Sequence, residues 1–192
     1  DNVLEQDIPT QIGNMLPLSD LRVQGNSLTG QLPNSITGLG GLLFLYIGDN
    51  FLTGTIPVDF GNLAQLRDFR ALRNNAGDGE RTGIGGTIPT SFGQLTRLGI
   101  LGLFQNSLSG TIPTEFGQLT GLVQLDVEQN LLTGDVPTEL ANLENLDVLL
   151  LGGNDLNDSL PNQELCDMEL QVFTTDCGLI CTCCTDCGTR RV

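Results

Sequence analysis

The chain is 192 residues long, has a formal net charge of −15, is 39% hydrophobic, and takes all eight of its basic residues from arginine. This length allows one domain with a substantial core, and the ordinary apolar content argues against a disordered acidic tail. The acidic balance without lysine argues against nucleic acid and anionic membranes as partners, and no apolar run approaches the ~18 residues of a membrane span.

A repeat organises most of the chain. Seven prolines recur at Pro9, Pro33, Pro57, Pro89, Pro113, Pro137 and Pro161. Seven asparagines recur at Asn2, Asn26, Asn50, Asn74, Asn106, Asn130 and Asn154. Within each series every step is 24 residues except one of 32. The pattern is N-x-L-[TS]-G-x-I-P-x-x-[FLI]-G-x-L-x-x-L-x-x-L-x-L-x-x-N, most clearly over residues 106–130, and such a period is typical of a solenoid.

This pattern closely resembles the plant-type leucine-rich repeat in its 24-residue form, with the L-T-G-x-I-P signature, over residues 2 to about 178. The resemblance implies an α/β-type solenoid, a right-handed coil with about seven parallel strands on its concave face. It also implies 3-10 or irregular turns on the convex face and a disulfide-rich C-terminal cap. We therefore expect repeats over residues 1–165 and a cysteine-rich cap over residues 166–192.

The physical reading of the repeat agrees with that fold. The L-x-L segments alternate with period two, as a half-buried strand requires. The segments that contain them begin at Leu18, Leu42, Leu66, Leu98, Leu122, Leu146 and Leu170. We expect the recurring asparagine to bond to backbone groups at the inward turn and to the asparagine one coil away, which makes it part of the scaffold. The G-x-L-x-x-L stretch is expected to form 3-10-like turns.

The N-terminal residues DNVLEQDIPT have neither the basic nor the apolar region of a signal peptide. They occupy the place of N-x-L-T-G-x-I-P, so the chain begins in the middle of a repeat. A bare repeat end exposes apolar surface. We expect a fragment of a longer chain, with homo-association through this uncapped N-terminal end as one option.

The outward positions of the strands carry the candidate ligand-binding residues, which are Arg22, Phe44, Tyr46, Arg67, Arg70, Leu72, Arg73 and Phe104. Arginine mixed with exposed aromatic side chains is typical of interface centres. Tyr46 is the only tyrosine and stands between Arg22 and Arg70 in its column, so cation–π contact with either is plausible. Gly48 and Gly102 are expected to leave hollows beside Tyr46 and Phe104.

Simple surface pairing is the alternative for these arginines. Arg73 shares a column with Asp49, and Arg70 is near Asp68, so each arginine can be balanced by a local acid. If the arginines are not balanced in this way, they can take a carboxylate or a sulfate of a ligand.

Eight residues are added between Asn74 and Pro89, and we expect NAGDGERTGIGG, residues 75–86, to replace the x-L-T-G turn. Five glycines make this insertion flexible, and it leaves the sheet directly after the coil that carries Arg67, Arg70 and Arg73. Some plant receptors of the family have insertions that help to form ligand sites. A tolerated surface loop is the equal alternative, because long loops cost little closure entropy.

The last 27 residues hold all the cysteines, Cys166, Cys177, Cys181, Cys183, Cys184 and Cys187. An even number in one terminal segment favours disulfides and an oxidising compartment, although four of them close together leave zinc as an alternative. The segment resembles the cysteine-rich caps of secreted repeat proteins, and its crowded CTCCTDC is most similar to those of algae such as diatoms. Asn157 lies in the only N-x-[ST] sequon and is the glycosylation candidate.

These features predict a non-catalytic, extracellular or cell-surface recognition module that binds a protein, peptide or glycan on its concave face. No cofactor or metal is expected, and a chain without histidine or lysine lacks the usual general base. The resemblance leaves open a secreted inhibitor of a wall-degrading enzyme. Ice binding is a third option, because Thr55, Thr87 and Thr111 form one column and Thr90, Thr114 and Thr138 form another.

Overall fold

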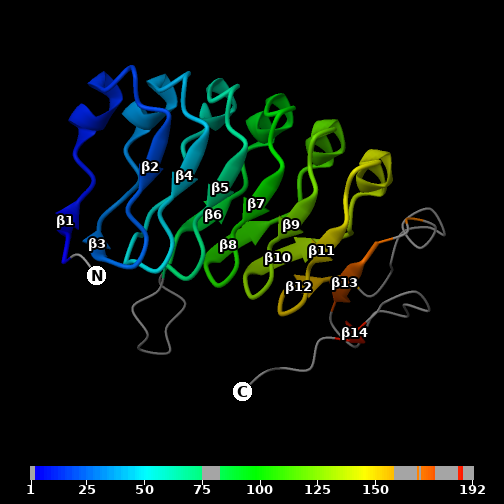
Figure 1. The fold of residues 1–192 in the computed structure, drawn as a ribbon. Helices are drawn as coiled ribbons and strands as arrows, with labels where there is room; N and C mark the ends of the chain where they lie inside the picture. Colours follow the sequence, from blue (N-terminus) through cyan, green and yellow to red (C-terminus); the bar gives the residue numbers. More distant parts are fainter. Residues whose placement is uncertain (1–2, 75–82, 158–167, 169, 176–185, 188–192) are drawn as a thin grey trace.

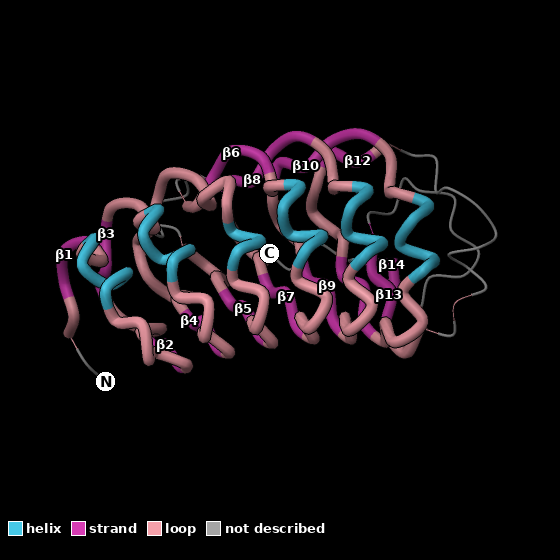
Figure 2. Tube along the Cα trace, turned by 90° about the horizontal axis from the view of Figure 1, so that it is seen from above, coloured by secondary structure: helices cyan, strands magenta, loops and turns pink. Residues whose placement is uncertain are grey.

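The computed structural model describes residues 3–157, except 75–82, together with residues 168, 170–175 and 186–187. The described residues form a single stack of similar coils (Figure 1). Figure 2 shows a long sheet along one side of the stack, short strands along the other side, and 3-10 helices between them. This arrangement confirms the predicted solenoid.

The long sheet has eight parallel strands in the order β14-β13-β11-β9-β7-β5-β4-β2. Their bounds are β2 (Asp20–Arg22), β4 (Phe44–Tyr46), β5 (Asp68–Arg70), β7 (Ile100–Gly102), β9 (Gln124–Asp126), β11 (Val148–Leu150), β13 (Val172–Thr175) and β14 (Asp186–Cys187). The seven strands from β2 to β13 in this list are those that the L-x-L pattern predicted. β14 was not predicted, and β13 continues the sheet beyond residue 165.

The register of the long sheet reproduces the predicted columns. Arg22 is opposite Tyr46, Tyr46 is opposite Arg70, and Arg70 is opposite Gly102. The residues between the outward positions, such as Leu45 and Phe69, are fully buried. Period-two alternation therefore places one face of each strand in the core and the other on the inner surface of the stack.

A second set of short parallel strands on the opposite side was not predicted. β1 (Glu5–Asp7) pairs with β3 (Ser27–Thr29), and a separate sheet contains β6 (Gly85–Thr87), β8 (Ser107–Gly110), β10 (Leu131–Gly134) and β12 (Asp155–Leu156). These strands lie over the L-T-G part of the repeat. Gly86, Gly110 and Gly134 of these strands adopt positive φ, which is +75° at Gly110. Glycine is normally depleted in strands, which is why the sequence did not suggest them.

The 3-10 helices lie earlier in the repeat than predicted. They are η1 (Thr10–Asn14), η2 (Asn34–Gly38), η3 (Phe60–Asn62), η4 (Thr90–Gln94), η5 (Thr114–Gln118) and η6 (Thr138–Asn142). All except η3 begin directly after the repeat proline, whose fixed φ, −64° at Pro89, holds an extended backbone before the turn. Among the described residues, none of the helices has the length and apolar character that crossing a bilayer requires.

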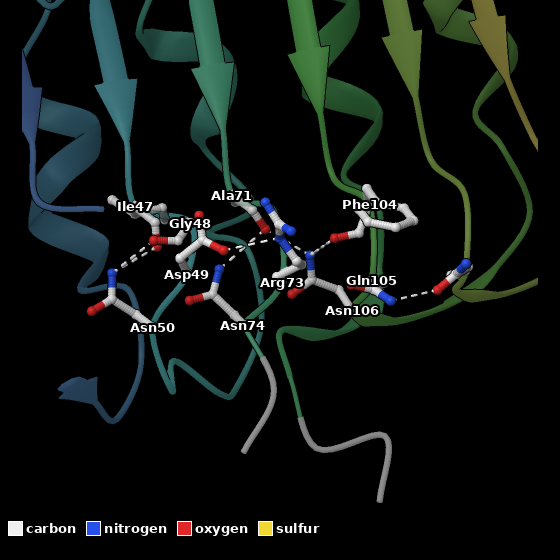
Figure 3. A network of polar contacts seen from close by, with 11 residues as sticks. Ile47, Gly48, Asp49, Asn50, Ala71, Arg73, Asn74, Phe104, Gln105 and Asn106 are labelled. Carbon is white, nitrogen blue, oxygen red and sulfur yellow. Dashed lines mark hydrogen bonds and ion pairs between the residues drawn. The ribbon is translucent and has the colours of Figure 1, made fainter. Parts of the chain in front are cut away.

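The recurring asparagines hold neighbouring coils together through the backbone (Figure 3). The Asn106 Nδ2 group donates to the carbonyl oxygens of Ala71 at 2.6 Å and Leu103 at 3.0 Å, and its Oδ1 accepts the backbone N–H of Ile84 at 3.2 Å. The expected bond from this side chain to the asparagine one coil away is wrong, because backbone groups of two coils occupy its amide.

The insertion does not replace the x-L-T-G turn, which corrects the expectation from the sequence. Gly85 forms a bridge with Thr55 and donates its N–H to the Gly54 carbonyl, so residues 84–86 occupy the L-T-G place of the repeat. The added residues therefore precede this turn, and residues 75–82 lie outside the described part. Asn74 ends the preceding coil and is fully buried, and its Oδ1 has no hydrogen-bond partner among the described residues.

Candidate recognition surface

The inner surface of the long sheet brings two arginines and two aromatic rings together on β2, β4 and β5. The Arg22 guanidinium carbon lies 4.8 Å from the centroid of the Tyr46 ring and 5.6 Å from that of Phe44. The Arg70 guanidinium carbon lies 5.3 Å from the Tyr46 centroid. Tyr46 therefore stands between two cations, as the column order predicted, at distances where cation–π attraction operates.

Aspartates two residues before each arginine fix these guanidinium groups. The Arg22 Nε donates to Asp20 at 2.8 Å, and Arg70 forms two bonds to Asp68, 2.9 Å from Nε and 3.0 Å from Nη2. We call Asp20, Arg22, Phe44, Tyr46, Asp68 and Arg70 the arginine–aromatic cluster.

Asp68 holds two members of the cluster at once. It is only 7% exposed, and besides binding Arg70 it accepts a 2.7 Å hydrogen bond from the Tyr46 hydroxyl. Sequence reasoning did not include Asp20 or Asp68 among the site residues. The D-x-R spacing, present at both 20–22 and 68–70, was the available signal, because residues i and i+2 of a strand share a face.

Burial raises the pKa of the Tyr46 hydroxyl, and the hydrogen bond to the Asp68 carboxylate raises it further. Because Tyr46 is the only tyrosine and the chain has no tryptophan, its absorbance is free of other phenols and indoles. We expect a spectrophotometric titration of tyrosinate to have its midpoint above the ordinary value of about 10. In Asp68→Asn the midpoint should move down, since the negative charge that opposes ionisation is gone.

Circular dichroism at each pH is the control that the protein stays folded during this titration. A midpoint at the ordinary value in the folded wild-type protein, or one that Asp68→Asn leaves unchanged, contradicts the contact between Tyr46 and Asp68.

The other predicted site residues lie around the cluster. The Arg73 backbone N–H donates to the Phe104 carbonyl, and the Arg73 Nε pairs with Asp49 at 2.9 Å, which confirms the surface pair expected for that column. Arg67 is exposed and directly precedes β5, which begins at Asp68.

The two hollows expected at glycines do not exist. A Cβ at Gly102 would lie 2.8 Å from Cδ2 of Leu72, so the Leu72 side chain already fills this space. A Cβ at Gly48 would lie 2.8 Å from the Leu72 carbonyl oxygen, where the backbone of the next coil passes. The inner surface beside the cluster is therefore covered by Leu72.

The fifth coil gives the same surface an acidic part. Burial raises the pKa of Asp126 to about 6, and the neighbouring charge of Glu128 adds to this, while a hydrogen bond from the Glu128 backbone N–H at 3.2 Å opposes it. The Glu128 carboxylate in turn accepts a hydrogen bond from the Thr174 hydroxyl. Asp126 is thus two strands away from Arg70, with Gly102 between them in the register.

The remaining candidates lie away from this surface or outside the described residues. Asn157 is exposed, and its Nδ2 donates to Asp135 at 2.7 Å. Of the six cysteines only the backbone of Cys187 is described, in β14, so the disulfides and the zinc alternative fall outside the described part. Within the described residues, no three His, Cys, Asp or Glu side chains lie close enough together to hold a metal ion.

The threonine columns lie away from the long sheet, and ice binding stays a prediction. Thr87 belongs to β6, while Thr90, Thr114 and Thr138 each begin a 3-10 helix. A shallow groove of about 410 Å³ runs between the last two coils of these columns. Its lining residues are Thr111, Ile112, Thr114, Asp135, Val136, Pro137 and Thr138.

The chain is similar to parts of plant receptors. A family model described as Leucine Rich Repeat matches residues 17–39 and 41–63. The LRR receptor-like serine/threonine-protein kinase EFR of Arabidopsis thaliana is 43% identical over 58 residues, which are 30% of this chain and 6% of that protein.

Two solved structures extend the similarity. The Arabidopsis receptor kinase HAESA, in complex with the peptide hormone IDA and the co-receptor SERK1, matches with a TM-score of 0.78 and 32% identity, over 91% of this chain and 28% of that chain. The LRR ectodomain of the Arabidopsis thaliana receptor kinase SOBIR1 matches with a TM-score of 0.62 and 33% identity, over 71% of each chain. The chain thus spans less than a third of the length of EFR and HAESA.

Proposed function

The chain belongs to the plant-type leucine-rich-repeat family, and on that basis we propose that it is an extracellular recognition module without catalytic activity. Its ligand is a peptide, or an extended segment of a protein, bound on the inner surface of the long sheet. The module belongs to a receptor-like protein at the cell surface. Similarity to HAESA, which was solved with a peptide hormone, supports a peptide over a glycan.

The arginine–aromatic cluster is the observation that carries this proposal. Arginine and tyrosine are enriched among the residues that dominate binding energy at interfaces. Here they lie on three adjacent strands, and ion pairs on the same surface hold them in place. Side chains that are already ordered lose little conformational entropy when a ligand binds.

The test substitutes side chains on the inner surface whose removal should leave the fold intact. Arg22→Ala and Phe104→Ala remove two predicted contacts, and the partner of Arg22, Asp20, is itself exposed. Arg70→Ala is a poorer choice than the sequence suggested, because it would leave the buried carboxylate of Asp68 without its counter-ion. A phage-displayed library of linear peptides, selected on the immobilised 192-residue chain, supplies the ligands.

We expect each variant to bind the selected peptides about tenfold or more weakly, which corresponds to a loss of about 1.4 kcal/mol in binding free energy. Isothermal titration calorimetry measures the affinities. The matched control is Arg97→Ala, an exposed arginine that bonds to Gln65 outside the cluster, and it should change affinity less than twofold. Peptides that bind both inner-surface variants as tightly as the wild type, or selection that enriches no peptide, would refute the proposal.

A further inference from the structure

The cluster is electrically neutral, although it contains two of the chain's eight basic residues. Its two guanidinium groups are paired with two carboxylates, Arg22 with Asp20 and Arg70 with Asp68. The whole chain has a net charge of −15. An anionic group of a ligand would therefore have to compete with these carboxylates and approach against the field of the protein.

The guanidinium groups remain partly open to solvent. Their carbons lie 4.8 Å (Arg22) and 5.3 Å (Arg70) from the centroid of the Tyr46 ring, and the Nε of each is bonded to an aspartate. The side chains of Arg22 and Arg70 are nevertheless 51% and 43% exposed. A planar guanidinium group with its edge occupied binds best through its face, by stacking on an aromatic ring.

We propose that the arginine–aromatic cluster binds an aromatic side chain of the ligand peptide, rather than an anionic group, by stacking it on Arg22 and Arg70. This inference rests on the proposed function and names the chemistry of its ligand. Asp68 acts as the positioning residue, since it neutralises Arg70 and bonds the Tyr46 hydroxyl, which keeps the ring close to both guanidinium groups.

The burial of Asp68 explains why the surface keeps its shape before a ligand arrives. A carboxylate that is 7% exposed cannot exchange its protein partners for water without cost. It therefore keeps Tyr46 and Arg70 bonded in the free protein. Asp20, the partner of Arg22, is exposed, so Arg22 is the more adaptable side of the cluster.

Three small probes separate aromatic recognition from anion recognition. N-acetyl-phenylalaninamide is the aromatic probe, N-acetyl-leucinamide the matched aliphatic probe and sodium sulfate the anionic probe. Titration of each into the isotope-labelled chain is followed by NMR at the Nε–H groups of Arg22 and Arg70 and at the Tyr46 ring. Sodium chloride at equal ionic strength is the blank for the sulfate arm.

We expect the aromatic probe to shift these signals saturably and to bind with at least threefold higher affinity than the aliphatic probe. Sulfate should give no saturable shift. Arg22→Lys keeps the charge and removes the planar face, so it should weaken the aromatic probe at least threefold. Asp68→Asn, checked for folding by circular dichroism, should weaken the binding of that probe and should also lower the midpoint of the Tyr46 titration.

Three results overturn the inference: saturable binding of sulfate at these residues, equal affinity for both amides, or an Arg22→Lys variant that binds the aromatic probe like the wild type. The proposed function is judged separately. Displayed peptides could lose affinity in Arg22→Ala and Phe104→Ala and compete with sulfate but not with the aromatic amide. That result would support the recognition module and rule out an aromatic ligand group.

Discussion

Phe92→Ala is expected to lower the free energy of unfolding by about 3–5 kcal/mol, the usual cost of removing a buried aromatic side chain. Phe92 is fully buried, and its ring stacks on Phe60 with 4.9 Å between centroids and 13° between planes. On its other side the Phe116 centroid is 6.1 Å away, and Phe69 of the long sheet is 6.2 Å away. The substitution would therefore leave a cavity shared by three coils.

Urea unfolding followed by circular dichroism measures this loss by linear extrapolation. Phe51→Ala is the matched control, because Phe51 is 41% exposed and its removal should cost less than about 1 kcal/mol. In a solenoid each coil contacts only its neighbours, so a changed m-value would show that the damaged centre had uncoupled the two ends. A loss of less than about 1 kcal/mol for Phe92→Ala would contradict the described core.

Asn106→Ala is expected to lower the free energy of unfolding by about 3–5 kcal/mol, although it removes only a small polar side chain. The truncation would leave the N–H of Ile84 without its bond. The carbonyls of Ala71 and Leu103 would each lose one donor and keep another, from Asn74 and Asn130 respectively. A buried polar group left without a partner costs about 1–3 kcal/mol, and each lost hydrogen bond contributes about 0.5–1.5 kcal/mol. The three groups belong to both coils that flank the insertion, so Asn106 joins the chain across it.

Asn26→Ala is the matched control, since Asn26 makes the same kind of bonds from a half-buried position in an outer coil. We expect it to cost about 1–2 kcal/mol. Hydrogen exchange locates the damage. Amide exchange at Ile84 should accelerate in Asn106→Ala and stay slow in Asn26→Ala. Equal destabilisation by the two substitutions, or unchanged protection at Ile84, would show that Asn106 is not the link across the insertion.

The repeat made the long sheet predictable in detail. A fixed step of 24 residues determines which residues lie opposite each other, so the neighbours Arg22, Tyr46 and Arg70 followed from their numbers alone. The ion pair of Arg73 with Asp49 was predictable for the same reason. Such predictions hold because each coil repeats the backbone of the previous one, and a parallel sheet keeps equivalent residues side by side.

Features that depend on side-chain direction and local backbone were not predictable. The expected hollow at Gly102 ignored the Leu72 side chain, which leans across from the neighbouring strand. The short strands such as β8 contain glycines at positive φ, and no alternation of apolar residues marks them. The amide of Asn106 bonds to backbone groups of two coils. Leaving those groups buried without a partner would cost more free energy than leaving out a bond between two asparagine side chains.

The sequence by itself determined the solenoid and the columns of its inner surface, because these follow from spacing and alternation. Only the tertiary structure decided what the arginines are bonded to. The spacing left two partners open for Arg70, a ligand anion or Asp68, and the choice between them depends on rotamers and burial within one strand. The paired carboxylates turn an apparent anion site into a surface whose charges are balanced.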